Sequence, residues 1–130
     1  MKPEWEKAAR RGDAAALASQ IAAGADLDSR DRFGQSALML AAVGGHLAAV
    51  RVLIDAGANL DVSAKFGLTA LMLAVVNGHQ AVARALASAG ADLGLTGSGA
   101  PGFAGKTAAD LALDRGLPEL AAELSDGRAV

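Results

Sequence analysis

Residues 100–107 hold the closest likeness to a chemical motif in this 130-residue sequence. The segment ends in Gly105-Lys106-Thr107, and Ala100 stands where a phosphate-binding loop has its first glycine. Such a loop works between a buried strand and a helix, where its backbone amides and its lysine cradle phosphates. Residues 93–99 make a poor buried strand, and no apolar run ending in Asp is available to hold magnesium. We therefore expect this segment to form a mobile finger, with a nucleotide-binding enzyme that uses residues 100–107 as an alternative.

The side chains that could catalyse a reaction or bind a metal ion have no suitable partners. His46 and His79 are the two histidines, and they are 33 residues apart, in matching positions of a repeat. Because they are one repeat apart, we expect their side chains to lie about 10 Å from each other in space. That distance is too large for both to hold one metal ion, whose ligands lie about 2 Å from it. The chain has no cysteine, and its serines lack a histidine base outside the repeat pattern. We predict that the chain is not an enzyme and has no catalytic residue, cofactor or metal site.

The composition predicts one domain of closely packed helices, residues 1–130. Hydrophobic residues make up 52% of the chain and aromatic residues 3%, so most of the apolar side chains are alanine, leucine and valine. Alanine favours helices and lets their backbones approach each other. The longest apolar runs, 37–43 and 70–76, are seven residues long, shorter than the ~18 residues of a membrane-spanning helix. Residues 1–7 are charged and unlike a secretory signal, so we expect a cytoplasmic protein, or a periplasmic one if a signal has been removed.

A repeat of 33 residues runs through the chain. Residues 33–41 align with residues 66–74. The sequence Gly-Ala-Asp-Leu at 24–27 and 90–93 aligns with Gly-Ala-Asn-Leu at 57–60. In the last part of the chain the match resumes after a five-residue insertion. A period of this length is typical of a solenoid built from repeated helical units.

Each unit is predicted to contain two short helices and a turn. In the second unit Ser36 caps the first helix, because its hydroxyl can accept a hydrogen bond from a free backbone amide. Gly44-Gly45 ends that helix and Gly57 ends the next one, because glycine readily takes the left-handed conformation of a helix end. Leu53 and Leu86 take equivalent core positions. Helices this short are marginal alone, so the stacking of units must hold the chain folded.

These residues resemble the ankyrin-repeat family over nearly the whole chain. The family motif has a glycine, Thr-Pro-Leu-His, Ala-Ala, Gly-His, a leucine pair and Gly-Ala-Asp. Here Ser36-Ala37 and Thr69-Ala70 stand for Thr-Pro, and Met39 and Met72, which we interpret as core residues, stand for the first histidine. These replacements remove hydrogen bonds that would tie neighbouring units. The resemblance implies an all-α, helix-turn-helix solenoid with hairpin-like loops and about four units.

The first and last units are expected to cap the stack. The four units span residues 1–28, 29–61, 62–94 and 95–130, and the last unit contains the insertion. Charged residues cover the first helix of the first unit, and the last unit carries several carboxylates and a polar tail at 125–128. Polar outer faces keep the terminal repeats of a solenoid soluble.

The resemblance implies that the chain binds a partner protein on a concave face formed by finger tips and first helices. The expected partner-binding residues are Arg10, Arg11, Arg30, Arg32, Phe33, Gln35, Val43, Ser63, Lys65, Phe66, Leu68, Val76, Asn77, Lys106 and Arg115. With Asp31 and Asp114, this face carries seven basic and two acidic residues, hence +5, and the rest of the chain carries −7. We therefore expect a partner protein with an acidic patch, and neither a membrane nor a small-molecule substrate.

Several alternatives stay open at this stage. The basic residues could act only as solubilising charges, or the basic face could bind nucleic acid. Few spaced phosphate contacts and a net charge of −2 argue against nucleic acid. The partner could also be an enzyme whose acidic site the chain covers, rather than a scaffolded protein. Phe33 and Phe66 either anchor in the partner or tuck under the next turn.

Overall fold

The computed structural model describes residues 1–125, and eight α-helices and one short 3-10 helix form in that range. The α-helices are α1 (Pro3–Arg11), α2 (Ala14–Ala22), α3 (Ala37–Val43), α4 (Leu47–Asp55), α5 (Ala70–Val76), α6 (Gln80–Ser88), α7 (Ala108–Asp114) and α8 (Pro118–Ser125). The 3-10 helix η1 spans Lys65–Gly67. The polar tail predicted beyond Ser125 lies outside the described residues.

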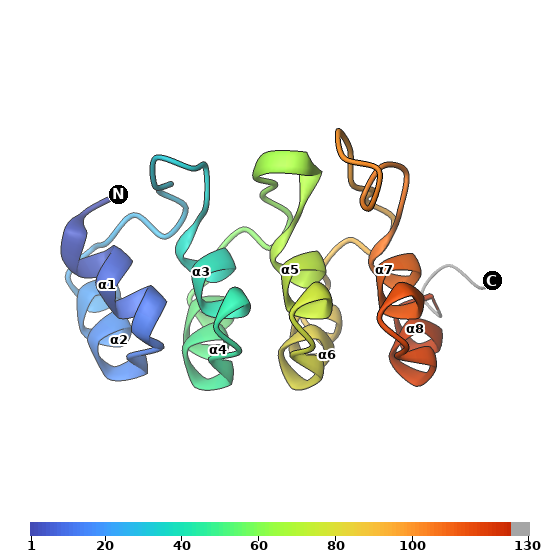
Figure 1. The fold of residues 1–130 in the computed structure, drawn as a ribbon. Helices are drawn as coiled ribbons and strands as arrows, with labels where there is room; N and C mark the ends of the chain where they lie inside the picture. The colour runs from blue at the N-terminus through green and yellow to red at the C-terminus, as the bar shows by residue number, and fades with distance from the viewer. Residues whose placement is uncertain (126–130) are drawn as a thin grey trace.

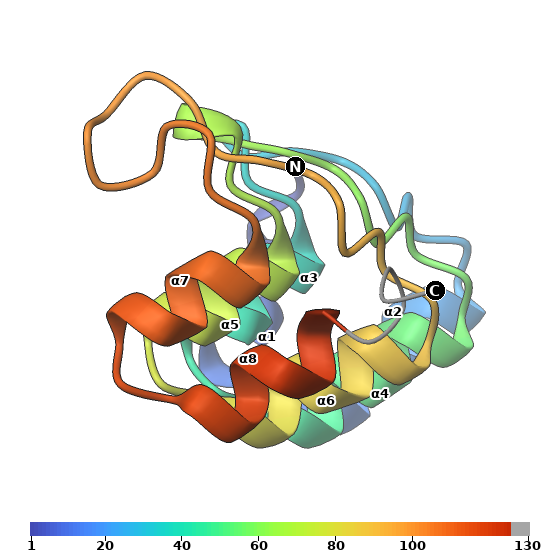
Figure 2. The ribbon, with the colours of Figure 1, turned by 90° about the vertical axis from the view of Figure 1, so that its right-hand side faces the viewer.

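The helices form four pairs that stand side by side in a row (Figure 1). The first helices α1, α3, α5 and α7 contact one another in that order, and so do the second helices α2, α4, α6 and α8. Seen along the row, the first and second helices form two layers (Figure 2). The predicted all-α solenoid is therefore confirmed.

Loops project from the same side of the first helices (Figure 1). We call residues 30–36 the first finger, residues 63–69 the second finger and residues 97–106 the insertion loop. Isolated bridges join Arg30 to Ser36 in the first finger and Gly97 to Ala104 in the insertion loop. No β-strand forms in residues 1–125, so these loops resemble hairpins only at single bridges.

Side-chain caps start three of the first helices. Ser36 Oγ accepts a hydrogen bond from the Met39 amide at 3.3 Å, which confirms the predicted cap. Thr69 and Thr107 do the same at α5 and α7. Ser36, Thr69 and Thr107 are buried, and each satisfies a helix amide that would otherwise lack a partner.

Histidines connect each inner unit to the unit before it. Nε2 of His46 lies 3.1 Å from the Arg10 carbonyl oxygen, and Nε2 of His79 lies 2.9 Å from that of Val43. A carbonyl can only accept, so each Nε2 carries the proton and donates. A Cβ at Gly12 would lie 2.3 Å from the His46 ring, so this close approach requires glycine. Each of the two histidines thus forms a contact between neighbouring units.

Carboxylates form a second set of contacts between units. Asp28 Oδ1 accepts from the Asn59 amide at 2.9 Å, and Asp61 Oδ1 accepts from the Asp92 amide at 2.8 Å. Asp26 stays within its own turn and accepts from the Asp28 amide. The aspartates at 28 and 61 thus tie the turn of one unit to the turn of the next.

The interface with the last unit is built differently. Leu117 stands where the inner units have a histidine, and Gly94 stands where they have an aspartate. An ion pair between Arg84 Nε and Glu123 Oε2, 2.7 Å apart, joins α6 to α8 instead. Since both side chains are largely exposed, this pair replaces little of the missing stabilisation.

Buried leucines between the helix pairs set the stability of the stack. Leu53 and Leu86 are fully buried at equivalent positions of α4 and α6. Each Leu→Ala change should lower the free energy of unfolding by about 2–5 kcal/mol, measured by denaturant titration. Leu113→Ala is the matched control, because this leucine is 59% exposed; it should change stability by about 0.5 kcal/mol or less. Equal losses at the buried and exposed sites would contradict the packing.

Candidate functional site

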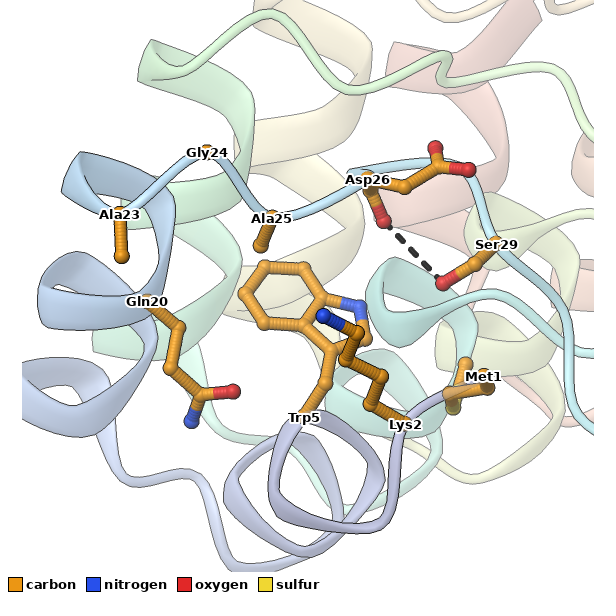
Figure 3. A pocket seen from close by; sticks show the side chains of 9 residues that line it. All are labelled: Met1, Lys2, Trp5, Gln20, Ala23, Gly24, Ala25, Asp26 and Ser29. Carbon is orange, nitrogen blue, oxygen red and sulfur yellow. Dashed lines mark hydrogen bonds between the residues drawn. The ribbon is translucent and has the colours of Figure 1, made fainter.

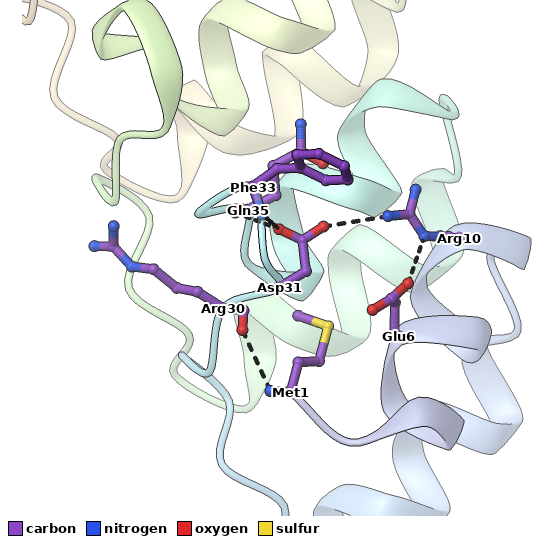
Figure 4. Close-up of polar contacts among 7 residues, drawn as sticks. All are labelled: Met1, Glu6, Arg10, Arg30, Asp31, Phe33 and Gln35. Carbon is purple, nitrogen blue, oxygen red and sulfur yellow. Dashed lines mark hydrogen bonds and ion pairs between the residues drawn. The ribbon is translucent and has the colours of Figure 1, made fainter.

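The first finger is held by one buried carboxylate. Asp31 Oδ1 accepts hydrogen bonds from the amides of Phe33 and Gln35, each at 2.9 Å, and Oδ2 lies 3.2 Å from an Arg10 guanidinium nitrogen (Figure 4). The Asp31 side chain is 2% exposed. A carboxylate that bonds two amides of its own turn fixes that turn. The finger tip is therefore presented in one conformation.

Phe33 stands at the tip and is 60% exposed. The Arg32 guanidinium carbon lies 4.9 Å from the centre of its ring, close enough for a cation–π contact. Of the two predicted arrangements for this residue, the structure has the exposed one. An apolar ring and a cation thus share the tip of the first finger.

The second finger differs, although its sequence is equivalent. Ala64 replaces the aspartate, and Phe66 takes a φ of 64°, the left-handed region that non-glycine residues rarely adopt. The insertion loop supports it: the Ser98 amide donates to the Phe66 carbonyl at 2.8 Å, and the Phe66 and Phe103 ring centres are 5.8 Å apart. Phe66 is therefore half-buried against the next loop.

A hollow of about 430 Å³ lies between the two fingers. Its lining residues are Arg32, Phe33, Gln35, Ala64, Lys65, Phe66, Leu68 and Leu73. It thus brings together six of the predicted partner-binding residues. One of them, Leu68, is a buried core residue that reaches the surface only as part of this wall. Lys65 Nζ lies 5.0 Å from the centre of the Phe66 ring, which repeats the pairing of cation and aromatic ring.

A second hollow, of about 390 Å³, lies on the other side of Phe33. Its lining residues are Met1, Glu6, Arg10, Arg30, Asp31, Arg32 and Phe33. Arg10 forms ion pairs with both Glu6, at 3.1 Å, and Asp31 (Figure 4). Its charge is thus matched within the chain, so it contributes little to an attractive field. The four-residue spacing of Glu6 and Arg10 on one helix could have revealed their pairing from the sequence.

The remaining predicted residues do not line these hollows. Arg11, Val43, Val76, Asn77 and Arg115 lie at the C-terminal ends of the first helices. Ser63, at the base of the second finger, accepts from Arg30 through its carbonyl. Lys106 pairs with Asp114. The predicted face therefore divides into a finger region and a helix-end region. Three residues that line the hollows of the finger region, Glu6, Ala64 and Leu73, were not among the partner-binding residues predicted from the sequence.

Three cations remain without an acidic partner at the fingers. Arg30, Arg32 and Lys65 form no ion pair within residues 1–125. They surround the two phenylalanines and the apolar wall made by Leu68 and Leu73. Of the other basic residues of the predicted face, Arg10 and Lys106 are paired with carboxylates, and Arg11 and Arg115 lie at the ends of the first helices.

The segment that resembles a phosphate-binding loop is closed on itself. The amides of Ala104, Gly105 and Lys106 donate to the carbonyls of Ala100, Gly97 and Phe103. The Lys106 ammonium is bound to Asp114. The amides and the lysine that would cradle a phosphate are therefore engaged within the protein. Across residues 1–125, no group of three or more His, Asp or Glu side chains is placed to hold a metal ion, and no helix there is long and apolar enough to cross a membrane.

Calorimetry with magnesium-ATP tests this assignment of the insertion loop. We expect no heat of binding. Lys106→Ala should change the free energy of unfolding by less than about 1 kcal/mol, because its ion pair is partly exposed. Micromolar ATP affinity that disappears in the Lys106→Ala variant would show that the loop opens to bind phosphates.

Comparison with known proteins supports the repeat assignment. Residues 6–96 match the family model described as ankyrin repeats (3 copies). No curated protein matches the chain in sequence. Ankyrin repeats are generally protein–protein interaction modules, and the family is typically non-enzymatic. The period of 33 residues, the four stacked helix pairs and this match, which covers more than half of the sequence, establish that the chain belongs to the ankyrin-repeat family.

Proposed function

We propose that this protein acts by binding, without catalysis, and that it binds a partner protein through its two fingers. The observation that carries the proposal is the exposed Phe33, which stands between two hollows with a cation over its ring. Phe33 adjoins an apolar wall that includes Leu68 and Leu73, and contiguous apolar patches rimmed by polar residues mark interaction sites. Aromatic and arginine side chains are also the commonest contributors to binding energy in protein interfaces.

The chemistry of the fingers suggests what the partner presents. Arg30, Arg32 and Lys65 favour a surface with acidic side chains, which the three cations would attract before contact. The hollow between the fingers has an apolar wall that includes Leu68 and Leu73. We infer a partner with an apolar side chain that enters this hollow and with carboxylates around it. The buried Asp31 holds the first finger in place, so little conformational entropy is lost on binding.

Nucleic acid fits this region less well than a protein does. The three cations without an ion pair lie within two adjacent fingers, whereas Arg10 and Lys106 are paired with carboxylates. A nucleic-acid backbone needs a longer row of cations spaced to meet successive phosphates. The net charge of −2 adds no long-range attraction. Strong salt-dependent binding to random-sequence DNA would favour this alternative.

Charge reversal at the fingers tests the steering of the partner. A partner captured by crosslinking from native lysate would be measured by surface plasmon resonance. Arg32→Glu and Lys65→Glu should each slow association by about threefold at low salt, with a smaller effect as salt rises. Arg51→Glu is the matched control, because Arg51 is exposed on α4 of the second-helix layer. Arg84 is unsuitable as a control, since its reversal would break the ion pair with Glu123. Equal slowing by Arg51→Glu would contradict the choice of face.

Removal of the exposed ring tests the anchor. Phe33→Ala should speed dissociation by about 30-fold, the effect of losing a residue worth about 2 kcal/mol of binding. Circular dichroism should show an unchanged fold, because the ring is mostly in solvent. Phe66→Ala is not equivalent, because it also removes the contact with Phe103. An unchanged dissociation rate in Phe33→Ala would exclude the first finger as the anchor.

A further inference from the structure

A separate cavity of about 550 Å³ lies at the first unit, between the start of α1 and the segment that follows α2. Its lining residues are Met1, Lys2, Trp5, Gln20, Ala23, Gly24, Ala25, Asp26 and Ser29 (Figure 3). The hollow between the fingers shares none of these residues, and the second hollow shares only Met1. The cavity is therefore a separate candidate binding site.

Trp5 forms one wall and has an unsatisfied donor. Its side chain is 2% exposed, and its indole Nε1 is buried with no hydrogen-bond partner among the described residues. A buried donor without a partner loses its hydration and gains nothing in exchange, so native structures usually supply an acceptor. In Figure 3 the nitrogen side of the ring faces the part of the cavity bordered by Lys2 and Ser29. An acceptor in the cavity would complete this site.

The cavity has polar residues where the inner units have apolar ones. Gln20 takes the repeat position of the fully buried Leu53, and Ser29 takes that of the buried Val62. Trp5 itself takes the position of Leu38. The first unit thus combines one large apolar surface with hydrogen-bonding groups at places where the rest of the stack is closed by aliphatic side chains.

Positive charge borders the unsatisfied donor. The Lys2 side chain extends across the front of the Trp5 ring in Figure 3. Helix α1 begins at Pro3 with no side-chain cap, so its positive end also borders the cavity; Glu4 and Glu6 in the first turn offset part of that charge, but neither lines the cavity. The Asp26 carboxylate accepts from the Asp28 amide, and in Figure 3 it points away from the indole. The groups around the indole N–H therefore favour an anion.

We propose that this cavity binds a carboxylate that carries a short apolar group. The Trp5 indole N–H donates to one carboxylate oxygen, and the Lys2 ammonium pairs with the anion. Because Trp5 is 2% exposed, the Lys2 side chain moves off the ring when the acid binds, and the apolar group then lies against the indole ring and the methyl groups of Ala23 and Ala25. Either a small organic acid or the C-terminus of a peptide offers this chemistry. The site is independent of the partner surface proposed for the fingers.

The single tryptophan makes the test specific, because the chain has one indole N–H signal in a proton–nitrogen NMR spectrum. The probes are butyrate with butyramide, and N-acetyl-alanyl-leucine with its C-terminal amide. Both acids, or one of them, should shift the indole signal to saturation, whereas the uncharged amides should not. A response to butyrate alone would identify a small acid, and a response to the peptide alone would identify a chain terminus.

Charge variants complete the test. Lys2→Met should weaken binding of the acid by about threefold or more, the effect of losing one partly exposed ion pair. Lys7→Met removes the same charge from an exposed position of α1 that does not line the cavity, and it should leave the affinity unchanged. The proposal is overturned if the indole signal stays fixed with both acids, if the amides shift it equally, or if both variants weaken binding equally.

Discussion

The stacking of one helix pair on the next is the constraint from which the rest of the structure follows. The α-helices are seven to nine residues long, too short to persist alone in water. Burial of leucine and alanine between pairs supplies the driving force. The hydrogen bonds of His46 and His79 help to fix the register of the stack, because each must meet one carbonyl near the end of the preceding first helix. The glycine on which each ring rests makes that approach possible.

This constraint also positions the candidate sites. A fixed register places the fingers one repeat apart, so the hollow between them has a defined width. Arg30 adds a direct link, because it donates to the Ser63 carbonyl at the base of the second finger. The first unit has a neighbouring unit on one side only, so part of its surface is not covered by another helix pair. At the first unit, Trp5 closes the core in place of a leucine, and the cavity beside it is left with polar walls.

Repetition in the sequence was enough to predict the fold, because the 33-residue period, the helix caps and the glycines at helix ends are local signals. The differences between equivalent positions could not be predicted in this way. Phe33 and Phe66 align, yet the buried Asp31 fixes the first finger, and contact with Phe103 covers the second ring. Arg10 also pairs with Asp31, 21 residues away, and Lys106 pairs with Asp114, 8 residues away, so no helical spacing predicts these two pairs. The cavity at Trp5 depends on the shape of the space between segments, which a sequence pattern does not encode.

The central claim is that contacts between units hold these short helices in place, with apolar burial as the driving force and the histidine bonds as an added contribution at each inner interface. The interface before the last unit lacks both the histidine and the aspartate, with Leu117 and Gly94 in their positions. Native-state hydrogen exchange measures the opening free energy of each helix and tests this claim directly. Amides of α7 and α8 should open at a cost about 1–2 kcal/mol lower than those of α3 to α6, the worth of one or two hydrogen bonds. Equal opening free energies for all of these helices would contradict the account.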